Sequence, residues 1–390
     1  MKGWKEVNIK SISSRITSGG TPSTKCPEYY GGNIPWLNTK EVNFRVIEST
    51  ENYITELGLG NSSAKWIEAN SIIVAMYGAT AGKCALTKIP LTTNQACCNI
   101  TIDQKIADYK YIYYTLVDSY SELENMATGA AQQNLNAGMI AEFSILLPPL
   151  PEQKAIASVL SSLDDKIDLL HRQNKTLESM AETLFRQWFV EEADEGWEEG
   201  SLLNLIELIG GGTPKTDNPE YWDGGIPWLA GGDISSNHKS FIQTAQKTIS
   251  ELGLNNSSAK LLPKYSTVIS ARGTVGKYCL LSEPMAFSQS NYGIVPRIDN
   301  CFFFTYLLIN YVVEELQSSA YGSVFDTITT NTFRDLKIGI PTESTVRKFE
   351  ATVVPYFDKL LQNKIQIRTL ESLRDTLLPK LMSGEIRVKV

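Results

Sequence analysis

Two long stretches of the chain repeat apolar residues at alternating spacings of three and four positions. The first stretch runs from Glu152 to Phe189, and its apolar positions are Ile156, Leu160, Leu163, Ile167, Leu170, Leu177, Ala181, Leu184 and Trp188. The second has the same spacing at Phe349, Val353, Tyr356, Leu360, Ile367, Leu370, Leu377 and Leu381. Such a pattern is the seam of a coiled coil. We therefore predict two long helices that pair with each other, in preference to each packing only on its own domain.

Polar residues interrupt both seams. They are Asn174 in the first stretch, and Asn363 and Arg374 in the second. A polar residue in a helix seam lowers stability but fixes the register of the pair, which makes Asn174 and Asn363 candidate register residues. Pro355 lies near the start of the second stretch, and we expect it to kink or delay that helix.

Outside the seams, the apolar residues form short continuous runs. The runs at 71–76 and 266–270 lack strict alternation and lie among Gly, Pro and Asn turns, which is typical of buried strands. Helical patches at 109–116 and 305–316 are interspersed with them. The longest apolar run, 301–313, is too short to span a bilayer and predicts a buried helix. The pattern predicts mixed α/β domains.

The whole chain is duplicated. The segment TPSTKCPEYYGGNIPWL at 21–37 returns as TPKTDNPEYWDGGIPWL at 213–229, with eleven of seventeen positions identical. Similar segments are also paired along the rest of the chain: 55–65 with 250–260, 72–83 with 267–277, 143–148 with 336–341, and 177–184 with 370–377. A repeat of this length indicates two domain-sized copies and not a solenoid array. We predict α/β domains at 1–148 and 191–341, each followed by a long helix, at 149–190 and 342–390.

Composition narrows the class of protein. Hydrophobic residues make up 42% and charged residues 20%, as in a soluble globular chain. Lys2, Lys5 and Glu6 come too early for a signal peptide, and we expect neither export nor a membrane anchor. The six cysteines show no CxxC spacing, which predicts reduced thiols in a cytoplasmic protein. Two histidines in the whole chain argue against a zinc site, and we predict no metal.

The net charge of −7 does not exclude DNA as a partner. Nearly all of the excess lies at 191–200, a stretch with six acidic residues and no basic ones. The rest of the chain is close to neutral, and such a domain binds DNA if its basic groups share one face.

Two glycine loops, GATAGK at 78–83 and GTVGK at 273–277, superficially resemble phosphate loops. A P-loop has four residues between its glycines and a Ser or Thr after its lysine, whereas these loops have three and two residues, followed by Cys84 and Tyr278. We predict a glycine turn that leaves a buried strand. The functional alternative is a loop whose lysine contacts a DNA phosphate.

The sequence carries no duplicated catalytic group. Neither His171 nor His238 recurs in the other copy, and the LPPLP segment at 147–151 lacks the polar residue of an amino-methyltransferase loop. The chain is therefore expected not to be an enzyme itself.

The candidate DNA-binding residues lie in polar loops where the two copies mostly diverge, although the lysine of each glycine loop (Lys83 and Lys277) and one glutamine (Gln95 and Gln289) are shared by both copies. Asn and Gln pair with adenine, and Arg and Lys pair with guanine, so such loops suit the reading of base edges. Drift in unimportant surface loops is the alternative for any one stretch. Trp36 and Trp228 are expected in the core. If their side chains were exposed, they could stack on a ligand instead. The candidates are Lys40, Tyr77, Lys83, Thr93, Asn94, Gln95, Gln132, Gln133 and Asn134 in the first copy, and His238, Lys239, Arg272, Thr274, Lys277, Ser288, Gln289, Ser290, Asp326 and Thr327 in the second.

With these features, the sequence resembles the specificity (S) subunit of type I restriction-modification enzymes over essentially all 390 residues. The resemblance rests on the GTP and IPWL segments of each copy, the ARGTVGK loop at 271–277, and the LPPLPEQKAI segment at 147–156. The segment LRDTLLPKLMSGE at 373–385 is the most specific of these signals.

The resemblance implies two pseudo-repeated globular α/β target recognition domains, separated by two long helices that form an antiparallel coiled coil. Each domain would read one half of a bipartite target in double-stranded DNA. The helices would set the gap between the half-sites and dock the modification subunits. Two modification subunits would carry S-adenosylmethionine and methylate adenine, and two restriction subunits would use ATP and Mg for translocation and cleavage. The chain itself would hold no cofactor.

Two other classes of function stay open at this stage. The first is an enzyme, a methyltransferase or nuclease fused to its recognition module, which binding of S-adenosylmethionine by the isolated chain would support. The second is a scaffold or protein-interaction module that does not read DNA, for which binding to modification subunits without sequence-selective DNA binding would be the sign.

Overall fold

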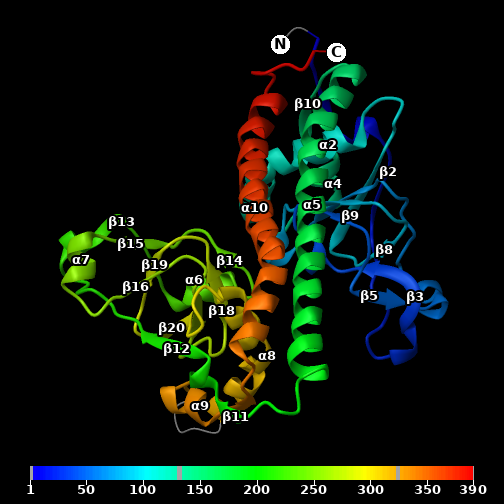
Figure 1. Ribbon diagram of the computed structural model, residues 1–390. Coiled ribbons are helices and arrows are strands. Elements are labelled where there is room, and N and C mark those ends of the chain that lie inside the picture. The colour runs from blue at the N-terminus through cyan, green and yellow to red at the C-terminus, as the bar shows by residue number, and fades with distance from the viewer. Residues whose placement is uncertain (1–2, 130–133, 322–325, 390) are drawn as a thin grey trace. The chain divides into compact units, whose positions relative to one another are not determined.

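The computed structural model describes residues 3–129, 134–321 and 326–389. The chain divides into two compact units, each described here by itself. Unit 1 comprises Met1–Asp168 and Thr369–Val390, and unit 2 comprises Leu169–Arg368. The division crosses both long helices, so each unit contains one α/β domain and one segment of each long helix (Figure 1).

The α/β domain of unit 1, called here the first domain, contains three sheets. The largest has the order β2–β9–β6–β7–β4, the second has the order β5–β3–β8, and β1 pairs with β10. Strands β3 and β8 run parallel, as do β4 and β7, whereas the other pairs are antiparallel. The strands are β1 Lys5–Asn8, β2 Ser13–Ser18, β3 Tyr30–Leu37, β4 Arg45–Ile47, β5 Asn52–Ile54, β6 Ile72–Ala75, β7 Cys84–Thr87, β8 Thr92–Thr93, β9 Cys97–Ile102 and β10 Ser144–Leu147.

The α/β domain of unit 2, the second domain, repeats this topology. Its sheets have the orders β12–β20–β17–β18–β14 and β15–β13–β19–β16, and β11 pairs with β21. Strands β13 and β19 run parallel, as do β14 and β18, at the places where the first domain has its parallel pairs. The strands are β11 Glu199–Ser201, β12 Ile206–Gly210, β13 Trp222–Leu229, β14 Phe241–Ile242, β15 Lys247–Ile249, β16 Leu261–Leu262, β17 Thr267–Ser270, β18 Tyr278–Leu281, β19 Met285–Phe287, β20 Asn291–Pro296 and β21 Lys337–Gly339.

Short helices complete each domain. Positions 302–313 of the apolar run lie in the helix α8, as predicted, and most of its apolar side chains pack in the core of unit 2. The first domain has two helices, α2 and α3, where the second has α8 alone; α2 ends at Asp118, with Ser119 as its C-cap, and α3 begins at Tyr120. The helices of the domains are α1 Glu56–Gly60, α2 Tyr109–Asp118, α3 Tyr120–Gly129, α4 Ala137–Ala141, α6 Gly231–Ser236, α7 Glu251–Asn255, α8 Phe302–Tyr321 and α9 Thr330–Asp335.

The two tryptophans of the repeated IPWL segment are core residues, as predicted. Trp36 is 7% exposed and Trp228 is 6% exposed. Their indole N–H groups donate to the carbonyls of Gly20 at 3.0 Å and Gly212 at 2.9 Å, which satisfies the one polar atom of each ring. They therefore stabilise the repeat and are not free to stack on a base.

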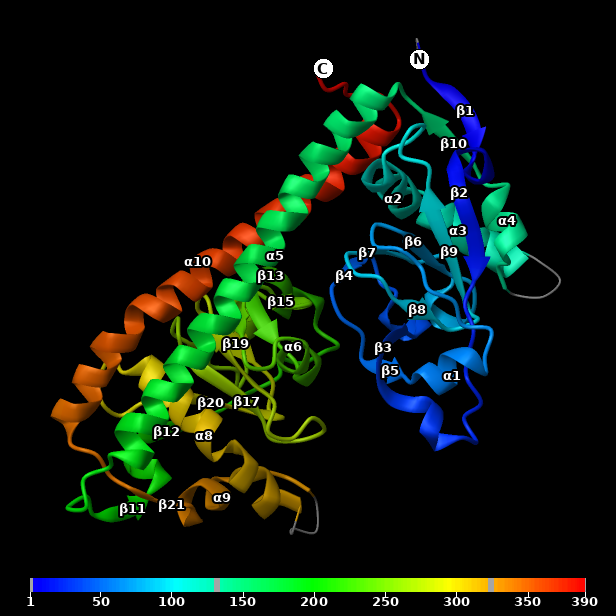
Figure 2. The same cartoon turned by 90° about the vertical axis from the view of Figure 1, so that its right-hand side faces the viewer.

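The long helices are α5, Leu150–Arg186, and α10, Glu343–Met382 (Figure 1, Figure 2). A π-helical turn, η5 at Gln187–Glu191, continues α5. The expectation that Pro355 delays the second helix is wrong, because α10 starts twelve residues earlier. The Thr342 hydroxyl accepts from the backbone N–H of Thr345 at 3.2 Å and caps that start. Among the described residues, no helix is both long enough and apolar enough to cross a membrane.

Within each unit, the segments of α5 and α10 lie side by side and run in opposite directions. In unit 2, Asn174 meets Asn363, while Phe185, later in α5, contacts Phe349, earlier in α10. The seam residues Ile167, Leu170, Phe349, Val353, Leu360 and Ile367 are all buried. The fold class predicted from the sequence, duplicated α/β domains with two long paired helices, is confirmed.

Candidate nucleic-acid interface

Three backbone hydrogen bonds join the divergent loops of the first domain. The N–H of Asn94 donates to the carbonyl of Leu37 at 3.0 Å, that of Met76 to Ala96 at 2.8 Å, and that of Leu135 to Met76 at 3.0 Å. They connect the ends of the strands β3, β6 and β8. We call the joined segments the first loop cluster: 38–45, 77–83, 93–96 and 134–135.

The second domain repeats this network. The N–H of Ser288 donates to Leu229 at 2.9 Å, that of Ala271 to Ser290 at 3.0 Å, and that of Ile328 to Ala271 at 3.1 Å. The same strand ends are connected, here of β13, β17 and β19. The second loop cluster consists of 230–240, 271–277, 288–291 and 326–328. Segments scattered along the sequence, and predicted separately, therefore meet at one place in each domain.

A buried carboxylate holds both ends of the most divergent loop. Glu41 is 4% exposed, and its two oxygens accept from the backbone N–H groups of Asn38 at 3.1 Å and Glu51 at 3.0 Å. Asp233 is 6% exposed and accepts in the same way from Ala230 at 2.9 Å and Gln246 at 3.0 Å. The loops that follow the IPWL segment differ in length and side chains between the two domains. In both domains, however, a buried carboxylate accepts backbone hydrogen bonds from both ends of the loop.

Sequence reasoning missed this pair, although a signal was present. Each carboxylate stands four residues after the last residue of the repeated IPWL segment, as Glu41 after Leu37 and Asp233 after Leu229. The residues around Glu41 and Asp233 differ between the two copies, and the carboxylate itself changes from Glu to Asp. The two positions were therefore not recognised as equivalent.

The glycine loops are turns that leave the buried strands β6 and β17, as predicted. Gly78, Gly82, Gly273 and Gly276 have φ values of 75°, 82°, 78° and 78°, a region that favours glycine. In the second domain, the amide of Gln317 on α8 donates to the carbonyl of Val275 at 2.8 Å and holds the loop against that helix.

The lysine of each glycine loop lies beside the divergent loop. The Nζ of Lys83 donates to the Oδ1 of Asn43 at 2.8 Å and lies 5.8 Å from the ring centre of Phe44. In the second domain, burial and then the nearby charge of Lys277 lower the pKa of His238. His238 Nδ1 accepts from the backbone N–H of Tyr278 at 3.3 Å. Each cluster thus gathers basic, aromatic and amide groups.

The candidate residues differ in how accessible they are. The structure describes Asn134 but not Gln132 and Gln133, which lie outside the described residues. The exposed candidates are Lys40, Tyr77, Gln95, Asn134, Lys239, Arg272, Thr274, Gln289 and Asp326. The half-buried candidates are Lys83, His238, Lys277, Ser290 and Thr327. The buried candidates are Thr93, Asn94 and Ser288.

The buried candidates hold the turns together. Asn99 Nδ2 donates to the hydroxyl of Thr93 at 2.8 Å, and Asn94 Oδ1 accepts from the N–H of Ala96 at 3.1 Å. In the second domain, Asn291 Nδ2 donates to the hydroxyl of Ser288 at 2.8 Å. These three side chains are buried and use polar atoms in bonds within the turns, and contact between them and DNA stays a prediction.

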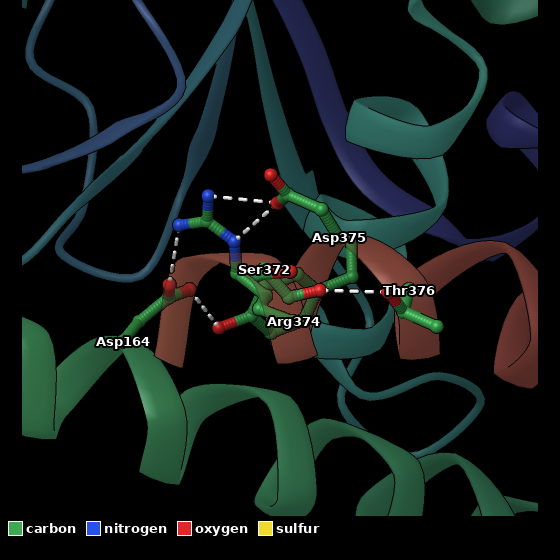
Figure 3. Close-up of polar contacts among 6 residues, drawn as sticks. Asp164, Ser372, Arg374, Asp375 and Thr376 are labelled. Carbon is green, nitrogen blue, oxygen red and sulfur yellow. Dashed lines mark hydrogen bonds and ion pairs between the residues drawn. The ribbon is translucent and has the colours of Figure 1, made fainter. Parts of the chain in front are cut away.

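Polar side chains also pair across the long helices. In unit 1, an Arg374 guanidinium nitrogen lies 2.9 Å from Asp164 Oδ1, and the guanidinium also pairs with its neighbour Asp375 (Figure 3). The hydroxyl of Tyr114 on α2 donates to Asp164 Oδ2 at 2.5 Å, and this acidic neighbour adds to burial in raising the Tyr114 pKa. The cluster links both helix segments to the first domain.

Two copies of one α/β domain, whose loop clusters share a backbone frame but differ in polar side chains, define a duplicated recognition protein. The chain belongs to the family of type I restriction-modification specificity subunits. The family model described as the type I restriction modification DNA specificity domain matches residues 1–179 and 194–370. The resemblance stated from the sequence is thereby confirmed.

Individual relatives agree with this assignment. The MjaIX specificity subunit of a type I restriction enzyme from Methanocaldococcus jannaschii is 29% identical, over 100% of this chain and 94% of its own length. The HindI specificity subunit from Haemophilus influenzae is 26% identical, over 63% of this chain and 70% of its own. The crystal structure of a type I S subunit from M. genitalium has a TM-score of 0.68 at 19% identity, covers 97% of this chain and 96% of its own, and shows the same fold.

Proposed function

We propose that the chain is the DNA-specificity subunit of a type I restriction-modification complex, in which each α/β domain reads one half of a bipartite target through its loop cluster. One observation carries this proposal: the two clusters share the same three backbone hydrogen bonds, yet present different exposed side chains. A fixed frame with variable polar groups suits two recognition modules with two different targets.

The exposed groups have the chemistry that base reading requires. The first cluster offers Gln95 and Asn134, whose amides can pair with adenine, and the second offers Arg272 and Gln289. The lysines of both clusters supply positive charge for phosphates, although the net charge of the chain is −7. The attraction to DNA depends on where the basic groups lie in each domain, and not on the net charge of the chain.

The paired helices have the role of a spacer in this proposal. The polar pairs Asn174–Asn363 and Asp164–Arg374 fix the register of α5 against α10 inside each unit. A fixed register sets a fixed gap between the half-sites, and the outer faces of the helices serve as docking sites for modification subunits.

Chemistry in the complex belongs to the partner subunits. Two modification subunits carry S-adenosylmethionine and methylate adenine, and two restriction subunits use ATP and Mg to translocate and cleave DNA. This cytoplasmic chain binds none of these cofactors and performs no catalytic step. The complex as a whole is a type I site-specific deoxyribonuclease.

Genome-wide mapping of methylated adenines tests the proposal. Cells that contain this gene and its modification subunit are compared with cells that lack this gene alone. We expect a bipartite motif, two short half-sites around a fixed gap, to lose methylation in the deletion. A purified complex that binds modification subunits but shows no sequence-selective DNA binding would instead establish a scaffold.

A further inference from the structure

The backbone of Arg272 is held in a tight turn at the tip of the second loop cluster. Its carbonyl accepts from the hydroxyl of Ser270 at 3.1 Å and from the N–H of Thr274 at 3.0 Å. The Thr274 hydroxyl donates to that of Ser270 at 3.1 Å, and Gly273 supplies the positive φ of 78°. The Cα of Arg272 is therefore fixed in place by its neighbours.

The side chain of Arg272 is free, in contrast to its anchored backbone. This side chain is exposed, and among the described residues of the two α/β domains Arg272 is the one arginine whose guanidinium has no hydrogen bond or ion pair. The remaining arginines of these domains have partners in the structure: Arg15 with Trp66, Arg45 with Glu41, Arg297 with Leu203 and Ile206, and Arg334 with Asn331.

An anchored backbone with a free guanidinium suits recognition. Little backbone entropy is lost when the group binds, because the turn is already formed. The N–H of Ile328 donates to the carbonyl of Ala271 at 3.1 Å, so that the exposed Asp326 lies in a segment adjacent to the arginine. The first cluster has Tyr77, which is 39% exposed, at the equivalent position.

We propose that Arg272 reads a guanine, by a bidentate pair with the O6 and N7 atoms in the major groove, within the half-site bound by the second domain. The planar guanidinium matches these two acceptors, and the pair is the commonest specific contact between proteins and DNA. This inference rests on the proposed function and names one base of that target. The competing role for a free arginine is contact with a phosphate, which would carry no sequence preference.

Sequence selection by the purified complex with modification subunits tests the inference. Wild type, Arg272→Gln and the control Lys337→Gln select from a library of random duplexes at several salt concentrations. Lys337 is also exposed but lies on β21, outside the second loop cluster and outside the long helices, so its replacement removes the same charge elsewhere in the second domain. Thermal unfolding of each variant verifies that it is folded.

We expect Arg272→Gln to lose its preference for guanine at a single position, by about 10- to 100-fold, while the other half-site and the gap stay unchanged. Lys337→Gln keeps the wild-type motif. A guanine preference unchanged at every position overturns the inference. So does uniform weakening across sequences with a smaller salt dependence, which identifies a phosphate contact. If the wild-type complex selects no bipartite motif, the proposed function itself fails.

Discussion

Asn363 Nδ2 on α10 donates a hydrogen bond of 2.8 Å to Asn174 Oδ1 on α5, inside the seam of the paired helices of unit 2. Asn363 has no exposed surface, and its own Oδ1 has no partner among the described residues. Burial of an unsatisfied amide oxygen lowers stability. The asparagine pair is therefore expected to fix the register of α5 against α10, and not to stabilise the helix pair.

Replacement of both asparagines by leucine should therefore stabilise the protein. We expect Asn174→Leu with Asn363→Leu to raise the free energy of unfolding by about 1–2 kcal/mol, because an apolar pair suits a buried seam. Denaturant titration at constant pH measures the change. The single variant Asn363→Leu serves as the control and should gain less, since it leaves Asn174 without its partner. A double variant less stable than wild type would show that the amide pair itself stabilises the seam.

An insertion in the same region tests the spacer role. One helical turn added after Asn174, with a matching turn before Asn363, lengthens the paired helices by about 5.4 Å. At roughly 3.4 Å per base pair, the tolerated gap should grow by about one or two base pairs, with both half-sites unchanged. Methylation mapping reads both properties at once. Altered half-sites would contradict the assignment of the helices to the gap.

The ion pair between Asp164 and Arg374 should stabilise the helix pairing of unit 1. Arg374→Met leaves the Asp164 carboxylate with the Tyr114 hydroxyl but no cation, and we expect a loss of about 1–2 kcal/mol in unfolding free energy. A double-mutant cycle with Asp164→Asn isolates the pair. Arg368→Met, at an exposed arginine of the same helix, is the matched control and should change stability by less than about 0.5 kcal/mol. A coupling energy near zero in the cycle would contradict the prediction.

Glu350 should make stability depend on pH. Its buried carboxylate accepts from the N–H groups of Phe303 at 3.1 Å and Phe304 at 2.7 Å at the start of α8, and burial raises its pKa from 4.5 to about 7. Because the folded pKa lies above the unfolded one, its contribution to stability is fully present below pH 4.5 and is lost as the pH rises through 7.

Comparison of wild type with Glu350→Gln isolates this effect. We expect wild type to lose about 3 kcal/mol relative to the variant between pH 4 and pH 8, by the conversion of the pKa difference into free energy. Glu207→Gln, at an exposed position, should follow wild type at every pH. Parallel stability curves for wild type and Glu350→Gln would contradict the raised pKa.

The buried carboxylates Glu41 and Asp233 should each control one half-site. Glu41→Ala frees both ends of the divergent loop in the first domain and leaves two backbone N–H groups without an acceptor. We expect a loss of about 1–3 kcal/mol in stability and a relaxed preference in one half-site only. Asp233→Ala should relax the other half-site, so the two variants are matched controls for each other in methylation mapping. Changes in both half-sites from one variant would contradict independent reading.

The sequence by itself determined the elements and the duplication. The alternation of three and four along 152–189 predicts α5, and the apolar runs at 71–76 and 266–270 predict β6 and β17, because these periods follow from the local geometry of helix and strand. The repeated IPWL segment also located Trp36 and Trp228 in the core. Family membership follows from the same repeated segments.

Only the tertiary structure decided which loops meet and which side chains face solvent. The turn at Thr93 joins the end of β3 because β8 pairs in parallel with β3, a choice among distant strands that no local period encodes. Thr93 and Asn94 are buried at this turn, whereas the next residue, Gln95, is exposed. The sequence alone does not distinguish the three as candidate DNA-binding residues. Burial and convergence are properties of segments that lie far apart in the chain, so they depend on the pairing of strands and not on the residues of any one loop.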